Sequence, residues 1–527
     1  MAELLFTGGR VFTGTGETDS ATAFRVVDGA FAWVGDDEHV RGERSVDLGG
    51  RTVVPGFIDS HTHPAVMTAK AGAAECFPPA VLSVEGLVEL LRSHADRTPD
   101  GWILGNGYDE TKFPGGHAPT AHDLDRVSST RPVLVWRCDS HSAVCNGAAL
   151  RLAGIDATTP DPPGARFERD ADGVPTGVLT EIAAVQAVSR LVPSASRDEQ
   201  IDALVAIGER FASHGITAVC DLMATAIDAP LEAFRTAAGR GLRQAVALYL
   251  GWNPAAPLAD LDEADRTGRV RVAGVKVVLD GAFSNRTAWV HEPYPGSCDH
   301  GLHAVPDEDV RAAADWARRN GVQLAIHAMG DRALDRVVDL FGDDDPWLQD
   351  RPSIRIEHAT LATPERLDRL SAARVGFGIA THTIFLFAEY DGYARNLPQA
   401  RLGEAYPVRA LYEGLPALAL SSDCPATAWA GADDVFVSVE AAVRRRAYNG
   451  ADIGQDAAVS VEQALLLYTG RAARLSPLTG VGTIAPGEEA SFVVLEDDIL
   501  SVPDDEISRV RIAETWMAGE RVFAARG

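Results

Sequence analysis

The feature that most constrains the fold is an alternation of apolar, strand-like segments with helical segments through the middle of the chain. One helical segment, "VPDEDVRAAADWARRNG", begins with acidic residues near Asp307 and ends at Asn320-Gly321. Strands that alternate with helices form parallel sheets, and eight of them predict a (β/α)₈ TIM barrel, an α/β fold. The eight predicted strands are 53–59, 216–222, 243–250, 272–280, 322–327, 354–358, 375–380 and 417–423.

Two further parts are predicted from the spacing of these segments. The gap between the first two strands is far larger than the others, so we expect residues 66–210 to form an insertion within a barrel that spans 56–474. Short alternating segments separated by glycine turns occupy both ends of the chain. They predict a small β-sandwich-like domain built from residues 1–55 and 475–527.

Composition excludes some partners. The 527 residues carry a formal net charge of −27, whereas nucleic acids and anionic membranes attract basic surfaces. No apolar run reaches the length of a membrane span, and the first residues lack the pattern of a signal peptide. Six scattered cysteines favour a reducing, cytoplasmic compartment over a disulfide framework. We therefore expect neither a nucleic-acid nor a membrane partner. The free edges of the terminal β domain separately favour a homodimer.

The stretch "PGFIDSHTHP" (55–64) places two histidines at the end of the first predicted strand. Side chains alternate along a strand, so His61 and His63 should point the same way. Two imidazoles on one side of a strand end make half of a metal site. The alternative is a pair of solvated loop histidines.

Other strand ends carry residues of the same chemistry. Catalytic groups of such barrels lie at the carboxyl ends of strands, and here His327, His358 and Asp423 occupy such ends, with Lys276 inside the fourth strand. Each histidine alone has the alternative of a hydrogen-bonded structural residue, and Asp423 that of a cap. Lys276 is harder to explain structurally, because its neighbours are valines and a buried lysine needs a partner.

These residues and their surroundings resemble the amidohydrolase superfamily, in particular the amidohydrolase family 3 branch that includes N-substituted formamide deformylase-like enzymes. The resemblance spans nearly the whole chain. Beside "PGFIDSHTHP", it rests on the stretches "WILGNGYDE", "RPVLVWRCDSHSAVCNGAAL", "GVPTGVLTE", "VKVVLDGAFSNRTA", "IHAMGDRALD", "RIEHAT" and "SSDCP".

The resemblance implies a site with one or two divalent metal ions. The mixed histidine and carboxylate donors suit zinc best, with iron and manganese as alternatives. His61, His63 and Asp423 would hold one ion, His327 and His358 the other, and a carbamylated Lys276 would bridge them. The implied activity is hydrolysis of a non-peptide C–N bond in a small amide, formamide or cyclic amide. Metal-bound hydroxide would attack the carbonyl carbon, with Asp423 as general acid and base. Ester hydrolysis, decarboxylation and a non-catalytic scaffold are the alternatives.

The chain departs from the family pattern at three places. The seventh strand reads "GFGIATHTIFLF" without the usual Gln-Pro, Ser491 replaces an aspartate near the carboxyl end, and Cys424 follows Asp423 where a small residue is usual. A nucleophilic Cys424 is an alternative, although no histidine beside it in the sequence marks it as activated. The candidate substrate-binding residues are His141, Tyr108, Asp109, Arg286 and His382.

Overall fold

The computed structural model describes the chain except residues 1–2, 37–44, 99, 163–164 and 527. Its centre is an eight-stranded sheet in the order β21-β20-β19-β18-β17-β16-β15-β8, in which every neighbouring pair is parallel. The α/β prediction of a barrel of eight parallel strands is confirmed. The strands are β8 (Phe57–Thr62), β15 (Ile216–Asp221), β16 (Ala245–Gly251), β17 (Val270–Val278), β18 (Gln323–Ala328), β19 (Ile354–His358), β20 (Phe377–Thr381) and β21 (Leu418–Leu420).

The barrel is nearly closed at the carboxyl ends of its first and last strands. The backbone N–H of Asp423 donates to the carbonyl of His61 at 2.8 Å, and the N–H of His63 donates to the carbonyl of Cys424 at 2.8 Å. These two bonds lie next to the residues predicted to hold a metal. Closure therefore fixes the backbone of the HxH segment against that of Asp423.

The first predicted strand is two strands in different sheets. β7 (Thr52–Pro55) pairs with a carboxyl-terminal strand, and β8 begins at Phe57. Gly56 separates them, and a Cβ there would lie 2.3 Å from Oγ1 of Thr217. A glycine therefore fits at the point where the chain passes from one sheet to the other, because a larger residue would clash with Thr217. The eighth strand is also shorter than predicted, because β21 ends at Leu420.

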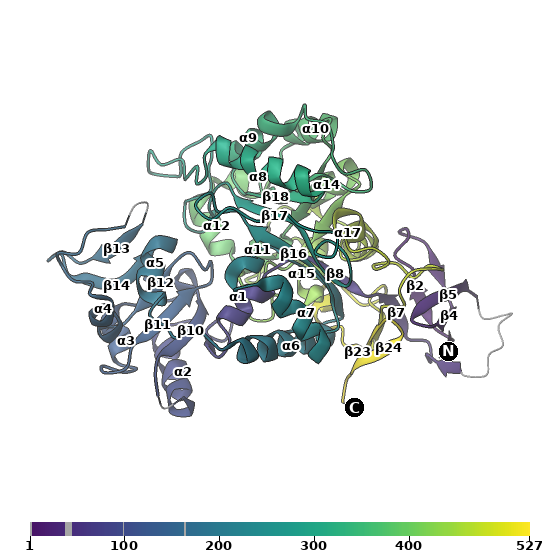
Figure 1. The fold of residues 1–527 in the computed structure, drawn as a ribbon, viewed down its shortest axis with the longest axis horizontal. Coiled ribbons are helices and arrows are strands. Elements are labelled where there is room, and N and C mark those ends of the chain that lie inside the picture. The colour runs from purple at the N-terminus through teal and green to yellow at the C-terminus, as the bar shows by residue number, and fades with distance from the viewer. Residues whose placement is uncertain (1–2, 37–44, 99, 163–164, 527) are drawn as a thin grey trace. The chain divides into compact units, whose positions relative to one another are not determined.

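Helices cover the outer face of the barrel (Figure 1). Apolar residues of the strands, such as Ile326 and Ile356, pack with helical residues such as Val310 and Leu334 in one core. Burial of each such side chain contributes about 1.5–3 kcal/mol. Helix α17 (Gly470–Leu475) packs instead with interior residues such as Ala218 and Ala325. The other helices outside residues 70–196 are α1 (Pro64–Ala69), α6 (Arg197–Ser213), α7 (Pro230–Arg240), α8 (Asp307–Asn320), α9 (Asp331–Phe341), α10 (Pro364–Ala372), α11 (Thr383–Ala388), α12 (Tyr390–Asn396), α13 (Gln399–Leu402), α14 (Val408–Gly414), α15 (Val435–Arg444) and α16 (Val461–Leu467).

Helix α8 illustrates how charged end turns and a terminal glycine predict the bounds of a helix. Its first turn is acidic and its last turn contains Arg318 and Arg319, charges that complement the helix dipole. Gly321 ends the helix with φ 62°, a left-handed conformation that glycine adopts without strain. The segment predicted from these signals is therefore the helix observed.

Strands from both chain ends form two further sheets, and purple amino-terminal and yellow carboxyl-terminal strands lie side by side in Figure 1. Phe6, Phe24, Phe492 and Trp516 pack together within one core. That these strands make a separate sandwich domain stays a prediction. One sheet has β5 (Ala30–Gly35), β4 (Ala23–Val27), β1 (Glu3–Thr7) and β6 (Ser45–Asp47), and the other has β24 (Glu520–Ala524), β23 (Ile512–Met517), β22 (Phe492–Leu495), β7, β2 (Arg10–Phe12) and β3 (Ser20–Ala21).

The chain divides into two compact units, one of which comprises 69–200 and 425–432. This unit has its own six-stranded sheet and apolar cores. That residues 66–210 form an insertion within the barrel stays a prediction. Its elements are β13 (Arg166–Arg169), β14 (Pro175–Thr180), β12 (Ala143–Cys145), β11 (Val133–Arg137), β10 (Ile103–Tyr108), β9 (Ala74–Glu75), α2 (Val84–Arg97), α3 (Ala121–Asp125), α4 (Gly147–Ala153) and α5 (Ile182–Ser189).

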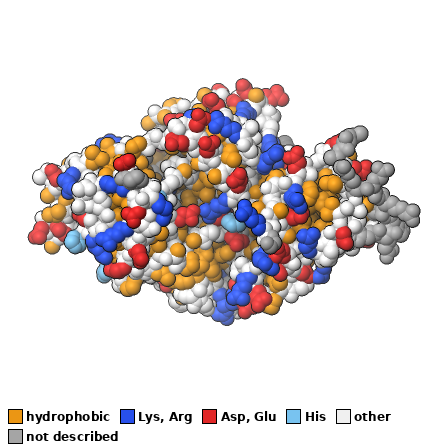
Figure 2. Space-filling view, turned by 90° about the horizontal axis from the view of Figure 1, so that it is seen from below, with side chains coloured by type: hydrophobic (Ala, Val, Ile, Leu, Met, Phe, Trp, Pro, Cys, Tyr) orange, Lys and Arg blue, Asp and Glu red, His pale blue; other side chains and the backbone are white. Residues whose placement is uncertain are grey.

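The surface is mixed in character. In the view of Figure 2, acidic and basic side chains are interspersed among hydrophobic ones. Within the described ranges, no helix has both the length and the apolar character needed to cross a bilayer. All six cysteines are described and none forms a disulfide.

Candidate metal centre

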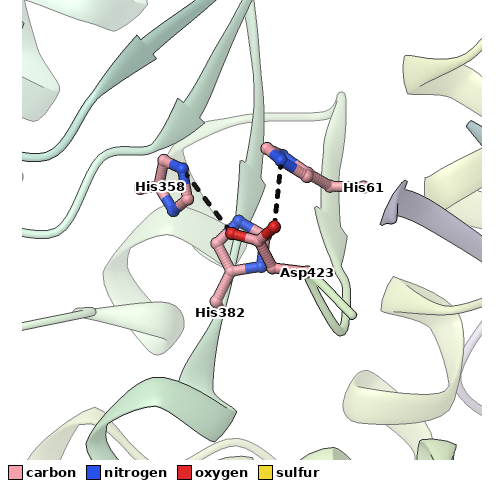
Figure 3. A group of neighbouring side chains, drawn as sticks. All are labelled: His61, His358, His382 and Asp423. Atoms are coloured by element: carbon pink, nitrogen blue, oxygen red, sulfur yellow. Dashed lines mark ion pairs between the residues drawn. The ribbon is translucent and has the colours of Figure 1, made fainter. Parts of the chain in front are cut away.

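Four buried side chains from four strand ends converge at the carboxyl end of the barrel (Figure 3). They are His61, His358, His382 and Asp423, and one potential ligand atom of each lies within 4.8 Å of the others. Nε2 of His61 is 3.5 Å from Oδ1 of Asp423, and Nε2 of His358 is 3.9 Å from Oδ2 of the same carboxylate. We call these four residues the metal cluster, because three imidazoles and a carboxylate form a donor set suited to zinc.

The other two predicted histidine ligands lie beside the metal cluster. His63 follows β8, and its Nε2 is 2.8 Å from Oδ1 of Asp423. The His327 ring on β18 has its centroid 4.4 Å from that of His358. Nε2 of His327 also lies 3.1 Å from the carbonyl of Gly281. The barrel thus gathers all four predicted histidines, although neither His63 nor His327 belongs to the four-residue set.

Lys276 lies inside β17, where it pairs in register with Gly251 and Ala325. It is 3% exposed, so its amine is removed from water as the sequence predicted. Burial lowers its pKa to about 8, while the negative charges of Glu357 and Asp423 oppose that shift. Lys276 is therefore a buried amine that interacts electrostatically with the cluster carboxylate.

His382, which the sequence places among the candidate substrate contacts, lies at the end of the seventh barrel strand. β20 ends at Thr381, and His382 precedes the first turn of α11. Its Nδ1 lies 3.2 Å from the carbonyl of Ser421 and its ring stacks on Phe385 at 5.1 Å. These contacts orient the ring, and His382 completes the metal cluster.

Histidine nitrogens in and beside the metal cluster have the protonation state and the free coordination sites that a cation requires. Nδ1 of His63, Nδ1 of His358 and Nε2 of His382 are buried without a hydrogen-bond partner among the described residues. Buried polar atoms are normally satisfied, so these three are available to a ligand. Burial lowers the pKa of His61, His358 and His382, assisted for His61 and His358 by neighbouring positive charges. Neutral imidazoles are the form that binds metals.

Asp423 supplies the negative charge of the cluster. Burial alone would raise its pKa, but the hydrogen bond from His63 and the positive charges around it lower the pKa below the usual value. The carboxylate is consequently ionised at neutral pH. It can accept a hydrogen bond or a proton and can bind a cation.

A buried ion pair, Glu357 and Arg355, lies beside Nδ1 of His61. Oε2 of Glu357 lies 2.6 Å from Nδ1 of His61, and Arg355 donates from Nε to Oε1 of Glu357 at 2.5 Å. Tyr249 extends this chain, because its hydroxyl accepts from Arg355 at 3.3 Å and donates to Oε1 of Gln323 at 2.6 Å. Metal-binding histidines commonly donate their second N–H to a carboxylate in this way, which fixes the ring and its tautomer. We call the hydrogen-bonded series His61, Glu357, Arg355, Tyr249 and Gln323 the polar column.

Glu357 and Arg355 are candidate functional residues that the pattern of strand ends does not predict. The signal was present in "IRIEH", where two charged residues alternate with isoleucines on a strand that must be buried on both faces. Ile354 and Ile356 pack in the outer core, so Arg355 and Glu357 face the barrel interior. Such a pair inside a barrel needs an internal partner, and His61 is that partner.

Two residues of the metal cluster have strained backbones. His358 has φ 73° and Asp423 has φ 54°, a region that residues with side chains seldom adopt. Strict alternation would put His358 with Ile354 and Ile356 on the outer face. The positive φ turns the chain at the strand end, and the imidazole joins the cluster instead. Strain retained at a functional site is a recognised pattern.

The amidohydrolase family profile matches residues 44–523, nearly the whole chain. The chain belongs to the amidohydrolase family. This family membership makes the chain a hydrolase that acts on carbon–nitrogen bonds other than peptide bonds.

Individual relatives agree with this assignment. The chain is 28% identical to the N-substituted formamide deformylase of Arthrobacter pascens, over 98% of each chain. It is 28% identical to the putative amidohydrolase YtcJ of Bacillus subtilis (strain 168), also over 98% of each chain. A crystal structure of an uncharacterized metal-dependent hydrolase from Pyrococcus horikoshii OT3 shares the fold. Its TM-score is 0.75 at 24% identity, over 96% of this chain and 99% of that one.

The other residues of the amidohydrolase that are predicted to contact substrate pack or pair with residues of the protein itself. Arg286, with φ 59°, donates from Nε to Oδ1 of Asn396 at 2.9 Å. Tyr108 is buried at the end of β10, and Asp109 pairs with Lys112 at 2.6 Å. Nδ1 of His141 lies 3.5 Å from a carboxylate oxygen of Glu181. Their contact with substrate stays a prediction.

Proposed function

We propose that this amidohydrolase is a metal-dependent enzyme that hydrolyses a small amide, formamide or cyclic amide. The observation that carries the proposal is the metal cluster, in which buried imidazoles and an ionised carboxylate converge. The formamide class is supported by the similarity to a protein named N-substituted formamide deformylase over 98% of both chains.

The donor set supports zinc as the resident ion. Nitrogen donors from His61, His358 and His382 and an oxygen donor from Asp423 match the ligands that zinc prefers. His63, His327 and Lys276 lie beside this set, and we retain them as ligands of one or two ions, with Lys276 as the bridge that the family resemblance implies. A bound zinc ion acts as a Lewis acid and brings the pKa of a coordinated water to about 7.

Asp423 is positioned to move the proton of the reaction. Its carboxylate is ionised and 4% exposed, so bulk water does not compete for the proton. Its Oδ1 accepts a proton from the attacking water and then delivers that proton to the departing nitrogen. General acid–base catalysis of this kind typically contributes about 10²–10⁴-fold. Hydrogen-bond partner His63 keeps the carboxylate oriented during both transfers.

Lys276 would serve the site as a carbamate. An ammonium group is repelled by divalent cations, whereas a carbamylated lysine is an anion with two oxygen donors. The neutral amine adds carbon dioxide at Nζ and releases one proton. The dry surroundings of β17 support this form, because a charged ammonium is costly there.

The test combines metal analysis with a substrate screen. Purified protein is analysed for bound zinc, iron and manganese and then assayed with N-formyl and N-acyl amines. Release of an amine or ammonia supports the proposal. Release of alcohol from esters, or of carbon dioxide alone, would assign a different reaction to the same site. Turnover that survives complete removal of metal would contradict the metal-dependent mechanism.

The six cysteines form no disulfide, which is compatible with the cytoplasmic location that we retain as part of the proposal. The partner we propose is a small-molecule substrate. Homodimer formation stays a prediction that size measurement in solution tests directly.

A further inference from the structure

A second polar site lies at the opposite mouth of the barrel, around the amino ends of β17 and β18. A cleft of about 390 Å³ is lined there by Arg266, Arg271 and Arg351. Arg271 is the second residue of β17, and Gln323, the first residue of β18, also lines the cleft. The metal cluster lies at the carboxyl ends of the strands, so the two sites are distinct.

Two of the three guanidinium groups are held by neighbours. Arg351 pairs with the adjacent carboxylate of Asp350. Arg266 donates from Nε to the carbonyl of Asp262 at 3.1 Å and from Nη1 to the carbonyl of Asn320 at 3.2 Å. These bonds position Arg266 but leave its charge unpaired by a carboxylate among the described residues.

Arg271 is the group with the least compensation. Its Nη1 donates to the carbonyl of Pro477 at 3.1 Å, but its Nε is buried with no hydrogen-bond partner in the described part of the chain. Burial and the nearby charge of Arg351 lower its pKa. The molecule thus keeps a half-buried guanidinium beside a second one, and no described carboxylate forms an ion pair with it.

This arrangement is unfavourable without a ligand. A buried donor that lacks an acceptor costs free energy, and two close cations repel each other. A guanidinium presents its donors as a planar fork that matches carboxylate and phosphate oxygens. Glu263 and Asp350 also line the cleft, which leaves three positive groups against two negative ones.

We propose that this cleft binds a small oxyanion, the phosphate or carboxylate group of a metabolite, with Arg271 as the principal contact. The volume of about 390 Å³ is within the range of small-molecule sites, so the anion can be part of a larger ligand. Arg266 and Arg351 supply the surrounding positive charge. The activity at the metal cluster does not require this site.

The test uses the full chain after the metal has been removed by chelation, so that an added anion cannot bind a metal ion. Inorganic phosphate and, separately, succinate are titrated by calorimetry at constant ionic strength. We expect saturable binding of at least one of them, and the tighter of the two identifies the phosphate or carboxylate source. Arg271→Gln should weaken binding at least tenfold, equivalent to about 1.4 kcal/mol.

Two further variants keep the test decisive. Arg319→Gln removes an exposed charge of α8 outside the cleft and should bind as the wild type does. Arg351→Gln should also weaken binding, and it replaces Arg271→Gln if circular dichroism shows that the latter fails to fold. The proposal is overturned if wild type shows no saturable binding up to about 10 mM of either anion, or if the folded cleft variant binds like wild type.

Discussion

The two mouths of this barrel present opposite electrostatic environments. At the carboxyl ends, neutral imidazoles surround an ionised carboxylate, a combination that attracts a cation. At the amino ends, guanidinium groups outnumber carboxylates around a cleft. β17 alone contributes Arg271 to one mouth and Lys276 to the middle of the barrel. Short parallel strands can therefore separate two charged sites within one fold.

The interior between the mouths differs from both. Small apolar residues such as Ala218, Ala247 and Ala325 fill it, together with the polar column. The column begins at Gln323, which lines the cleft, and ends at His61 in the metal cluster. The imidazole and carboxylate donors of the carboxyl mouth therefore suit a cation, whereas the guanidinium donors of the amino mouth suit an anion.

The largest expected effect comes from removing the charge of the carboxyl mouth. Asp423→Asn keeps the shape of the side chain but cannot accept the proton in catalysis. We expect turnover of the best substrate to fall by at least about 100-fold, the lower end of general acid–base contributions. The measurement is steady-state kinetics together with metal content and a thermal unfolding curve.

Asp368→Asn is the matched control, because Asp368 is an exposed residue of α10. It should retain wild-type turnover. If Asp423→Asn folded, retained metal and turned over at nearly the normal rate, the proton-transfer role of Asp423 would be wrong.

A smaller effect is expected behind the cluster, in the polar column. Glu357→Gln preserves size but loses the charge that faces His61 and Arg355. Loss of such a supporting carboxylate typically weakens metal binding about 10–100-fold. Competition with a chromophoric chelator measures zinc affinity independently of turnover.

The control for this change is Glu365→Gln, which alters an exposed glutamate in the first turn of α10. Its zinc affinity should match wild type. Unchanged zinc affinity in a folded Glu357→Gln protein would mean that Glu357 serves only the packing of Arg355.

How much of the fold the sequence predicts depends on whether a feature is determined by neighbouring residues or by residues far apart in the chain. Alternating apolar segments and helix ends such as Gly321 are local patterns, so the eight barrel strands could be predicted. The break at Gly56 could not, because β7 and β8 pair with strands that are remote in sequence and belong to different sheets. Strand continuity across 53–59 was therefore the wrong inference.

The candidate site shows the same limit. His61 and His63 could be predicted to lie near Asp423 because barrel chemistry collects at strand ends. The sequence predicts that His382 contacts substrate, and this stays a prediction; that it also lies close to His61, His358 and Asp423 could not be predicted from its neighbours in sequence. The local sequence identifies the residue type at the end of each strand. It does not identify the residue that this side chain contacts across the barrel. Functional roles of these residues stay predictions for the experiments above.

Arg210 differs from Arg271 of the proposed anion cleft because it has a buried carboxylate partner. It forms two bonds of 2.7 Å with the buried carboxylate of Asp433, and His214 lies 3.3 Å from the same carboxylate. Burial alone would raise the Asp433 pKa, but these neighbours lower it well below the usual value. The folded state therefore favours ionised Asp433, and its stabilisation is full above the unfolded pKa of about 3.9.

Stability from this pair should be lost as the pH falls below about 4, because protonation then favours the unfolded chain. Asp433→Asn should lower the free energy of unfolding by about 2 kcal/mol at pH 7, since it leaves a guanidinium without its carboxylate. The difference from wild type should shrink in acid. Urea unfolding at pH 7, 5 and 3.5 measures it, and a difference that stays constant with pH would refute the assignment.

The smallest expected effect concerns the arginine that lacks such a partner. Without an added anion, Arg271→Gln loses the bond to Pro477 but also removes the repulsion by Arg351 and a buried donor without an acceptor. These terms oppose each other, so the free energy of unfolding should change by less than about 1 kcal/mol. An oxyanion at about ten times its Kd should then stabilise wild type by about 1.4 kcal/mol and the variant by much less. Urea unfolding with and without phosphate measures both quantities. A large loss of stability in anion-free buffer would show instead that Arg271 already has its full complement of partners within the protein.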